Sequence, residues 1–246
     1  MNQKLKSLLK EGTTRLGVKI TDNQEMAFEL YFEELKKENE KLSLTSITDD
    51  REIVVKHFLD SLSCSMACGF SGGPKVVDIG TGAGFPGIPL KIVYPGAELT
   101  MLDSSNKKVK FLLGIIERLN LKGASAVCCR VEEYGINKNN REIFDLVLAR
   151  AVAPLSVLME YALPLLKVGG LFLAQKSRGL EKEICEGEEA AKVLGGRIKE
   201  VKEISVPFLE SKRYLVVTEK IFPSPEKYPR RTGIPTKRPL GRKQSF

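Results

Sequence analysis

The sequence lacks any long apolar run and any export signal. No stretch approaches the roughly eighteen consecutive apolar residues that a membrane helix needs, and the first residues, MNQKLKSLLKEG, place charges where a secretory signal has its apolar core. Of the 246 residues, 42% are hydrophobic and 28% are charged, a composition that excludes wholly disordered and fibrous proteins. We therefore expect a globular cytoplasmic protein without a membrane contact.

Histidine and paired cysteines are also scarce. The chain has one histidine, His57, and five cysteines, of which Cys64 and Cys68 are four apart and Cys128 and Cys129 are adjacent. Neither spacing is the C-x-x-C pair of a zinc site, so we expect reduced thiols and no metal. Any catalysis that depends on histidine must use His57.

The net charge of +8 is concentrated at the C-terminus. Residues 223–246 contain seven Lys/Arg and one Glu, a net of +6, together with five of the twelve prolines. Proline disfavours regular helices and strands, so we predict a mostly extended, basic, proline-rich C-terminal arm over 223–246. Such an arm is either a solvated terminus or a segment that tracks nucleic-acid phosphates, and composition leaves both open.

Helical patterns fill the first seventy or so residues. Apolar side chains give residues 23–38 one helical face, and acids before 51–67 can cap a second helix there. A glycine-rich turn at 69–74 ends the region, which predicts an N-terminal helical extension over residues 1–72.

From Lys75 onward, short β-branched runs alternate with helical stretches, as in βαβ units that build a parallel sheet. The last two runs are joined by a link too short for a crossover helix, so they should pair antiparallel. We predict an α/β domain over 73–222 with seven strands, five parallel and two in a closing hairpin. A helix fits each gap except the polar one after the third strand. The predicted strands are 75–79, 98–103, 124–129, 144–149, 170–175, 197–206 and 213–220.

The strongest functional signal is VVDIGTGAGFPGIPL (76–90). After the first predicted strand, Gly80, Gly82 and Gly84 follow in G-x-G-x-G spacing and precede a helix. Glycines here permit positive φ and a close approach of ligand to backbone, at the carboxyl edge of the sheet. Asp78, beneath this loop, can reach the amino group of a bound zwitterion.

Acids follow the next two predicted strands at the same edge. Asp103 ends the second strand, where a carboxylate can accept both hydroxyls of a ribose. Glu132 follows the third strand, where it can accept from an adenine amino group or simply be solvated. A glycine loop with acids at the two neighbouring strand ends predicts a site for a nucleoside-bearing cofactor.

Two cofactors compete for this pattern. Residues 82–87 formally spell the dinucleotide motif G-x-G-x-x-G, but that frame starts after the strand end instead of at it. The early G-x-G-x-G and the closing hairpin look like the Rossmann-like seven-stranded fold of S-adenosylmethionine-dependent methyltransferases. We favour S-adenosylmethionine over NAD. An NAD(P)-dependent oxidoreductase and a non-catalytic RNA-binding module on the same scaffold stay as alternatives.

The absence of two motifs limits which atoms could accept the methyl group. After the fourth strand the sequence is LARAVAP (148–154), not the Asn/Asp-Pro-Pro-Tyr of exocyclic-amine methylation, and no Pro-Cys pair is present for attack on a pyrimidine carbon. An acceptor with a free lone pair, such as N7 of guanine, fits best. Catalysis would then rest on holding N7 in line with the methyl–sulfur bond, without a general base.

Several segments resemble the bacterial 16S rRNA guanine-N7 methyltransferases of the RsmG family, also called glucose-inhibited division protein B. The similarity covers nearly the whole chain, and G-F-P-G-I-P-L and R-A-x-A-x-L are its most specific parts. Ser43 departs from the family's usual asparagine. The matching segments are 43–62, 76–95, 101–112, 129–134, 148–155, 173–179 and 227–240.

This resemblance implies methyl transfer to N7 of a guanine in 16S rRNA, either naked or within the small ribosomal subunit, and we expect a monomer. Positions that the family uses for the cofactor match Gly80, Phe85, Val131, Glu132 and Arg150; with the residues argued above, the set gains Asp78, Gly82, Gly84 and Asp103. Polar positions around the acceptor match His57, Asp60, Arg130, Arg150 and Lys176, and we take His57, Asp60, Arg150 and Lys176 as candidate catalytic residues.

Arg150 lies just after the fourth predicted strand. Arginine often bonds both O6 and N7 of guanine, but here N7 must stay free, so we predict a contact with O6 or a phosphate only. The alternative is a salt bridge with an acid such as Glu132.

His57 and Asp60 share one helix face and can contact each other. We interpret them as a structural pair more than a proton shuttle.

The other candidates are basic residues for RNA. Lys107 and Lys108 begin a helix, where cations oppose the helix dipole, which hints at a ligand phosphate, although such lysines are often only solvated. We expect that removing residues 223–246 weakens RNA binding and spares cofactor affinity. The predicted RNA contacts are Lys107, Lys108, Arg130, Arg230, Arg231, Lys237 and Arg238.

Overall fold

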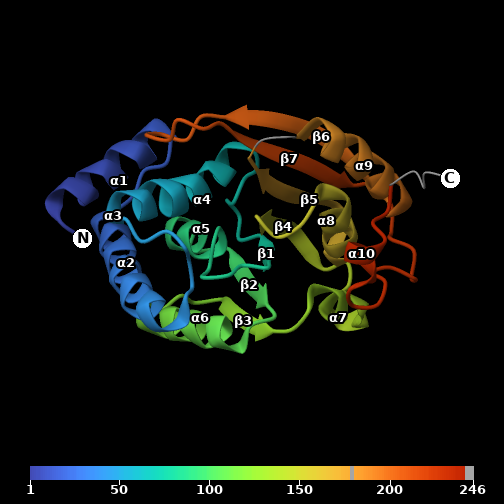
Figure 1. Cartoon of the computed structure of the whole chain (residues 1–246), viewed down its shortest axis with the longest axis horizontal. Helices are drawn as coiled ribbons and strands as arrows, with labels where there is room; N and C mark the ends of the chain where they lie inside the picture. The colour runs from blue at the N-terminus through green and yellow to red at the C-terminus, as the bar shows by residue number, and fades with distance from the viewer. Residues whose placement is uncertain (178–179, 242–246) are drawn as a thin grey trace.

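The structure is a computed structural model, and it describes residues 1–177 and 180–241. A seven-stranded sheet of order β3-β2-β1-β4-β5-β7-β6 runs through the molecule with helices on both faces (Figure 1). β1 to β5 are parallel, and β7 is antiparallel to both β5 and β6. The predicted α/β class, parallel strands and antiparallel closing pair are confirmed. The strands are β1 (Lys75–Ile79), β2 (Glu98–Asp103), β3 (Ala124–Cys128), β4 (Phe144–Arg150), β5 (Leu166–Lys176), β6 (Gly196–Ile204) and β7 (Arg213–Lys220).

Two layers of helices cover the sheet because its central strands are apolar on both faces. Side chains alternate along a strand, so Val76 of β1 packs in one cluster with Phe28 and Phe58, while Val77 and Ile79 pack in the other. The first layer holds α1 (Gln3–Arg15), α2 (Asp22–Leu42), α5 (Gly87–Val93) and α6 (Asn106–Arg118); the second holds α7 (Val131–Ile136), α8 (Leu155–Ala162) and α9 (Leu180–Val193). The N-terminal helices thus share a core with the sheet.

The predicted helix over 51–67 is a continuous helical stretch with a π-helical middle. It consists of α3 (Asp50–Glu52), the π-helix η1 (Ile53–Leu59), α4 (Asp60–Leu62) and the 3₁₀ turn η2 (Ser63–Met66). π segments are rare and often occur at functional sites. This one carries His57, and Asp60 follows it directly.

Short elements depart from the sequence expectations. The gap after β3, predicted to be a polar loop, contains the six-residue α7 and the 3₁₀ turn η3 (Lys138–Asn140), which are too short for a clear helical period. α2 ends at Ser43, whose φ of 50° is left-handed. Asparagine tolerates that conformation better than serine, which explains physically why asparagine suits this position.

The C-terminal segment, residues 221–241, folds back onto the domain, so the prediction of a mostly extended arm needs correction. It includes the short helix α10 (Ile234–Lys237) and lies beside α7 and α8 (Figure 1). Arg141 donates to the backbone oxygens of Ser224 and Tyr228, which compensates for the few regular hydrogen bonds of a proline-rich chain. Residues 242–246 of the predicted arm lie outside the described residues.

Candidate active site

Two pockets open at the carboxyl edge of the sheet, near the ends of β1 and β4. These strands are neighbours, and the strand order reverses between them, which is where open α/β sheets bind ligands. One has a volume of about 280 Å³ and is named the cofactor pocket here because it contains most of the strand-end residues predicted to bind a cofactor. The other, of about 420 Å³, is named the acceptor pocket because it contains the residues predicted to surround a methyl acceptor. The cofactor pocket is lined by Gly80, Asp103, Val131, Glu132, Tyr161 and Thr236, and the acceptor pocket by His57, Asp60, Arg150, Gln175, Lys176 and Arg213.

The loop that follows β4 is the wall between the two pockets. Ala151 lines the acceptor pocket, whereas Val152, Ala153 and Pro154 line the cofactor pocket. Ala151 has a φ of 55°, a left-handed conformation that a non-glycine residue adopts only at a cost. Ligands in the two pockets would therefore approach each other next to residues 151–154.

Glycine lets the loop after β1 touch this wall. Gly80 has a φ of 65°, and a Cβ built on it would lie 2.7 Å from Cγ2 of Val152. Gly84, with a φ of 103°, packs against Ile88, where a Cβ would lie 2.4 Å from Cδ1. The motif therefore serves close packing as well as the pocket, and of its three predicted glycines only Gly80 is among the lining residues.

Asp78 holds the glycine loop from beneath. Its side chain is fully buried, and Oδ2 accepts from the Thr81 hydroxyl at 2.6 Å and from the Gly87 amide at 2.9 Å. Oδ1 is buried without a hydrogen-bond partner, and burial raises the pKa of Asp78 to about 7. Because Asp78 is not among the residues that line the cofactor pocket, its contact with a cofactor amino group stays a prediction.

Two acids face the cofactor pocket from neighbouring strand ends. Asp103 accepts from the amides of Gly82 at 3.0 Å and Ser105 at 2.8 Å, which fixes its carboxylate. Glu132 is 4% exposed, and its Oε1 accepts from the Tyr161 hydroxyl at 3.3 Å and from the Gly233 amide at 2.9 Å. Within residues 1–177 and 180–241 no hydrogen bond reaches Oε2 of Glu132, so this oxygen is available. Fixed acceptors of this kind fit the hydroxyl and amino donors of an adenosyl group.

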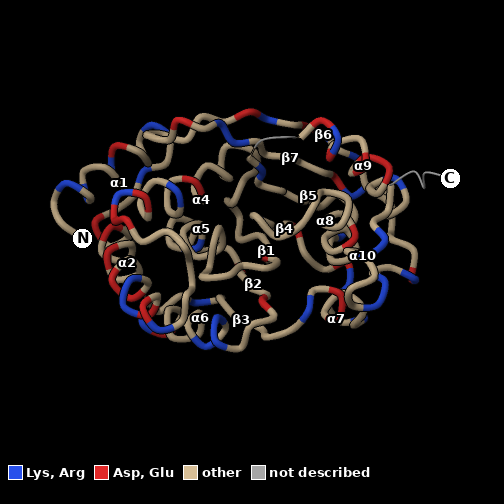
Figure 2. Tube along the Cα trace, viewed as in Figure 1, with Lys and Arg blue, Asp and Glu red and all other residues tan. Residues whose placement is uncertain are grey.

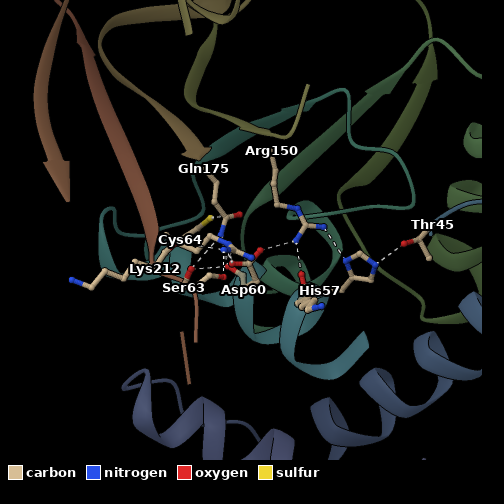
Figure 3. A network of polar contacts seen from close by, with 11 residues as sticks. Thr45, His57, Asp60, Ser63, Cys64, Arg150, Gln175 and Lys212 are labelled. Atoms are coloured by element: carbon tan, nitrogen blue, oxygen red, sulfur yellow. Dashed lines mark hydrogen bonds and ion pairs between the residues drawn. The ribbon is translucent and has the colours of Figure 1, made fainter. Parts of the chain in front are cut away.

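Asp60 is the centre of a buried polar network in the acceptor pocket (Figure 3). Its Oδ2 lies 3.2 Å from Nη1 of Arg150, and its Oδ1 lies 3.1 Å from Nε of Arg213 and 3.0 Å from Nε2 of Gln175. Burial raises the pKa of the Asp60 carboxyl, and the two guanidinium groups oppose that shift. The network fixes two arginines at the floor of one pocket.

Several neighbouring groups fix the position of the Arg150 guanidinium. Its guanidinium donates to the backbone oxygen of Lys56 at 3.1 Å and to Nδ1 of His57 at 3.3 Å, and lies over the ring of Phe85 at 5.0 Å. The Lys56 carbonyl belongs to the π segment η1, where a side chain can insert into the helical hydrogen-bond ladder. The ion-pair partner of Arg150 is therefore Asp60 and not Glu132.

His57 is buried and neutral. Its ring stacks on Phe85 with centroids 4.3 Å apart, and burial, followed by the charge of Arg150, lowers its pKa to about 3. Because Nδ1 accepts from Arg150, Nε2 must carry the proton and donate to the Thr45 hydroxyl at 2.8 Å. His57 and Asp60 are thus joined through Arg150, with no hydrogen bond to each other.

Lys176 supports the wall between the pockets. Its Nζ donates to the backbone oxygen of Ala153 at 2.8 Å and to Oε2 of Glu183 at 2.6 Å, and the same Glu183 oxygen accepts from the Leu155 amide at 2.9 Å. Lys176 lines the acceptor pocket, but these bonds make it a residue that holds the 151–154 loop.

The structure divides the predicted site residues between the pockets. The four candidate catalytic residues, His57, Asp60, Arg150 and Lys176, all line the acceptor pocket. Of the predicted cofactor residues, Gly80, Asp103, Val131 and Glu132 line the cofactor pocket, and Asp78, Gly82, Gly84, Phe85 and Arg150 do not. Phe85 is instead the aromatic platform beneath His57 and Arg150.

The predicted RNA contacts occupy different surroundings. Arg130 lines the cofactor pocket, and Lys107 lines a groove between α2 and α6. Arg230 is not available as a free cation, because its guanidinium makes a bidentate ion pair with the fully buried Glu160, with Nη2 and Oε2 2.6 Å apart. Arg231, Lys237 and Arg238 are exposed.

Sequence reasoning missed several polar residues of the site, among them Lys56, Glu183, Gln175, Arg213, Tyr161 and Thr236. A signal existed for Arg213, because the first residue of an antiparallel strand lies at the carboxyl edge of its parallel neighbours. None existed for Tyr161 and Thr236, which are 75 residues apart and meet only in the folded chain.

The described residues contain neither a metal-binding cluster nor a membrane-spanning helix. In residues 1–177 and 180–241, no cluster of three or more His, Cys, Asp or Glu side chains is placed to hold a metal ion. None of the helices in that part of the chain is both long and apolar enough to span a membrane.

A family model described as rRNA small subunit methyltransferase G matches residues 24–215. The chain is 47% identical to a ribosomal RNA small subunit methyltransferase G of Pelotomaculum thermopropionicum, over 96% of this chain and 99% of that protein. It is 43% identical to the protein of the same name from Bacillus cytotoxicus, over 91% and 94% of the two chains.

Solved structures share the fold at low identity. M. jannaschii TYW2 in complex with AdoMet superposes with a TM-score of 0.52 at 15% identity, over 66% of this chain and 75% of that one. The [4+2]-cyclase SpnF superposes with a TM-score of 0.55 at 11% identity, over 81% and 96%. A cyclase and an AdoMet-binding protein on one scaffold show that the fold alone does not define the reaction.

Proposed function

The chain belongs to the rRNA small subunit methyltransferase G family, and from that premise we propose that it transfers a methyl group from S-adenosylmethionine to N7 of a guanine in 16S rRNA. The observation that carries the proposal is a pair of pockets that adjoin at residues 151–154. Carboxylates outnumber cations in the lining of the first pocket, and cations outnumber carboxylates in the lining of the second.

The cofactor pocket supplies the acceptors that an adenosyl group requires. Asp103 is fixed by two backbone amides and faces the expected ribose, and Glu132 offers Oε2 to the adenine amino group. When bound, S-adenosylmethionine supplies an electrophilic methyl group on a positively charged sulfur. Because Gly80 has no side chain, the loop after β1 can pack against Val152 at the edge of the pocket.

The acceptor pocket suits an anionic nucleic-acid ligand. Lys56, Arg150, Lys176 and Arg213 line it against two carboxylates, Asp60 and Glu183. Arg150 is oriented before the ligand arrives, by Asp60, His57 and the Lys56 carbonyl, so it can donate to O6 or to a phosphate without losing side-chain entropy on binding.

No residue of the pocket needs to remove a proton. N7 of guanine has a free lone pair, so a general base is dispensable, and His57 stays neutral and in one tautomer through its bonds to Arg150 and Thr45. The task of the protein is to exclude water, to hold the purine, and to leave N7 unbonded.

The substrate and setting follow from the same proposal. Arg130 lines the cofactor pocket, and the exposed Arg231, Lys237 and Arg238 are within five residues of Thr236 in the chain. These cations would contact RNA phosphates, as would Lys107 and Lys108 at the start of α6. We infer that the enzyme acts in the cytoplasm as a monomer on 16S rRNA or a small-subunit particle.

Replacing Arg150 with methionine tests the assignment of the two pockets. We expect Arg150→Met to lower methyl transfer to small-subunit particles by about 100-fold or more, the loss typical of a pre-oriented donor. Affinity for S-adenosylhomocysteine should stay unchanged, because Arg150 lines only the acceptor pocket. The exposed Arg197→Met is the matched control. Full transfer activity in Arg150→Met would refute the proposal.

A further inference from the structure

The C-terminal segment is attached to the domain by buried polar groups at two points. At its start, the amide of Ser224 donates to Glu142 at 2.7 Å, and its hydroxyl accepts from the buried Lys220. Six residues later, Arg230 pairs with Glu160, which is 0% exposed, through both its guanidinium and its backbone amide, the latter at 2.8 Å. Among the described residues, Glu160 forms an ion pair only with Arg230 of this segment. A buried carboxylate is costly to leave unpaired, so the attachment is strong.

Beyond these two points the segment reaches the cofactor pocket. Thr236 lines that pocket, and its hydroxyl lies 3.2 Å from the hydroxyl of Tyr161. Tyr161 must donate to the Glu132 carboxylate, so Thr236 is the donor to Tyr161. Burial raises the pKa of Tyr161, which keeps the phenol protonated. The Gly233 amide donates to the same Glu132 oxygen at 2.9 Å.

We propose that the C-terminal segment is a structural wall of the cofactor pocket and that Thr236 is a positioning residue which, through Tyr161, orients Glu132 for the adenine amino group. The inference rests on the proposed cofactor. The Tyr161 hydroxyl, which Thr236 supports, and the Gly233 amide both donate to Oε1, which leaves Oε2 as the acceptor for the ligand.

This placement changes the expected role of the basic C-terminus. An arm that only tracks phosphates would leave cofactor affinity unchanged, whereas this segment bonds Glu132 directly through the Gly233 amide and indirectly through Thr236 and Tyr161. Its exposed cations, Arg231, Lys237 and Arg238, lie within seven residues of Gly233 and Thr236. One segment therefore serves both the cofactor pocket and the RNA-facing surface.

Calorimetric titration with S-adenosylhomocysteine tests the inference on the full-length chain without RNA. Thr236→Val removes the hydroxyl and keeps the shape, and we expect it to raise Kd about three- to tenfold, the worth of one oriented hydrogen bond. Thr236→Ser keeps the hydroxyl and should bind like wild type. The matched control is Thr232→Val, which removes a hydroxyl of the same segment that bonds Glu133 instead of Tyr161, and it should not change Kd.

A second arm separates positioning from general packing. If Thr236 acts through Tyr161, Thr236→Val should add nothing to the Kd of Tyr161→Phe. With small-subunit particles, Thr236→Val should raise KM for S-adenosylmethionine and leave kcat unchanged. Equal Kd values for wild type and Thr236→Val, or a full penalty in the Tyr161→Phe background, would overturn the inference and leave the proposed function intact. A wild-type chain that does not bind the cofactor product would overturn both.

Discussion

His57 is enclosed by Phe85, Arg150 and Thr45, and this enclosure decides its protonation. A protonated ring would have to give up the hydrogen bond from Arg150 and place two cations in contact at a buried site. The residue that first suggests itself for acid–base catalysis, as the only histidine of the chain, is therefore a neutral support for an arginine.

The charge state of His57 predicts a pH dependence of stability. Its folded pKa of about 3 lies below the ordinary 6.5, so between these values the unfolded chain binds a proton that the folded chain does not. Stability should fall as pH falls below 6.5. Between pH 6 and pH 4, His57→Gln should remove a slope of up to about 1.4 kcal/mol per pH unit from the urea-derived free energy of unfolding. Parallel profiles for the two proteins would contradict this assignment.

Replacing the Asp60 carboxylate with an amide should destabilise the folded chain strongly. Asp60→Asn removes the charge that faces Arg150 and Arg213 and leaves two partly buried cations without a counter-ion. We expect a loss of about 3 kcal/mol in the free energy of unfolding at pH 7. Glu219→Gln, which breaks the exposed pair with Arg197, is the control and should cost less than about 1 kcal/mol. Similar losses in both variants would argue against a special role for the network.

At the scale of the elements, the wall between the pockets depends on the contact between two loops. The loop after β1 approaches the loop after β4 at Gly80, while Lys176 holds the second loop through the Ala153 carbonyl. These contacts would therefore set the separation between ligands bound in the two pockets.

Gly80→Ala should disturb this contact. The new Cβ would collide with Val152, in addition to the strain of a φ of 65°, and we expect cofactor affinity to fall at least tenfold as the wall moves. Gly80→Ala combined with Val152→Ala should restore most of that affinity by removing the colliding methyl groups. Gly17→Ala, at a φ of 73° with open space around it, is the control for backbone strain and should leave Kd unchanged. Failure of the double variant to recover would show that the collision is not the cause.

The sequence predicts well the elements whose apolar residues follow a local pattern. The runs at 75–79, 98–103 and 213–220 match β1, β2 and β7 residue for residue, because an apolar run bounded by turn residues is typical of a buried strand. The π segment at Ile53–Leu59 was not predictable in the same way. The Lys56 carbonyl of this segment accepts a hydrogen bond from Arg150 at the end of β4, a tertiary contact that no local sequence period indicates.

The same distinction applies to the candidate site. Gly80, Asp103 and Glu132 were predictable because strand ends of a parallel sheet meet at one edge. Tyr161 and Thr236 were not, because only the fold brings α8 and the C-terminal segment together. Arg230 shows a related limit: composition counts a cation, but it does not reveal the buried Glu160 that pairs with it.

At the scale of the whole molecule, acidic and basic residues are interspersed along most of the chain, and a group of cations lies in the C-terminal segment near α10 (Figure 2). Because that segment packs beside the cofactor pocket, its exposed cations Arg231, Lys237 and Arg238 belong to the part of the molecule where the RNA would dock. Long-range attraction would then guide RNA toward the pockets.

Removal of the exposed cations should weaken RNA binding in a salt-dependent manner. Replacing Arg231, Lys237 and Arg238 together with alanine should reduce the slope of log affinity for 16S rRNA against log salt by about 2 to 3, close to one per phosphate contact. A triple alanine variant at Lys192, Arg197 and Lys199 removes the same charge near the opposite edge of the sheet. Equal slopes for the two triple variants would contradict a localised RNA surface.

The most direct test is to identify the atom that receives the methyl group. The purified chain would be incubated with small-subunit particles that lack the modification and with S-adenosylmethionine whose methyl group is deuterated, and the rRNA nucleosides would be analysed by mass spectrometry. We predict one labelled nucleoside, 7-methylguanosine, from a single site in 16S rRNA. Label on another atom or base, or no label in rRNA at all, would contradict the account.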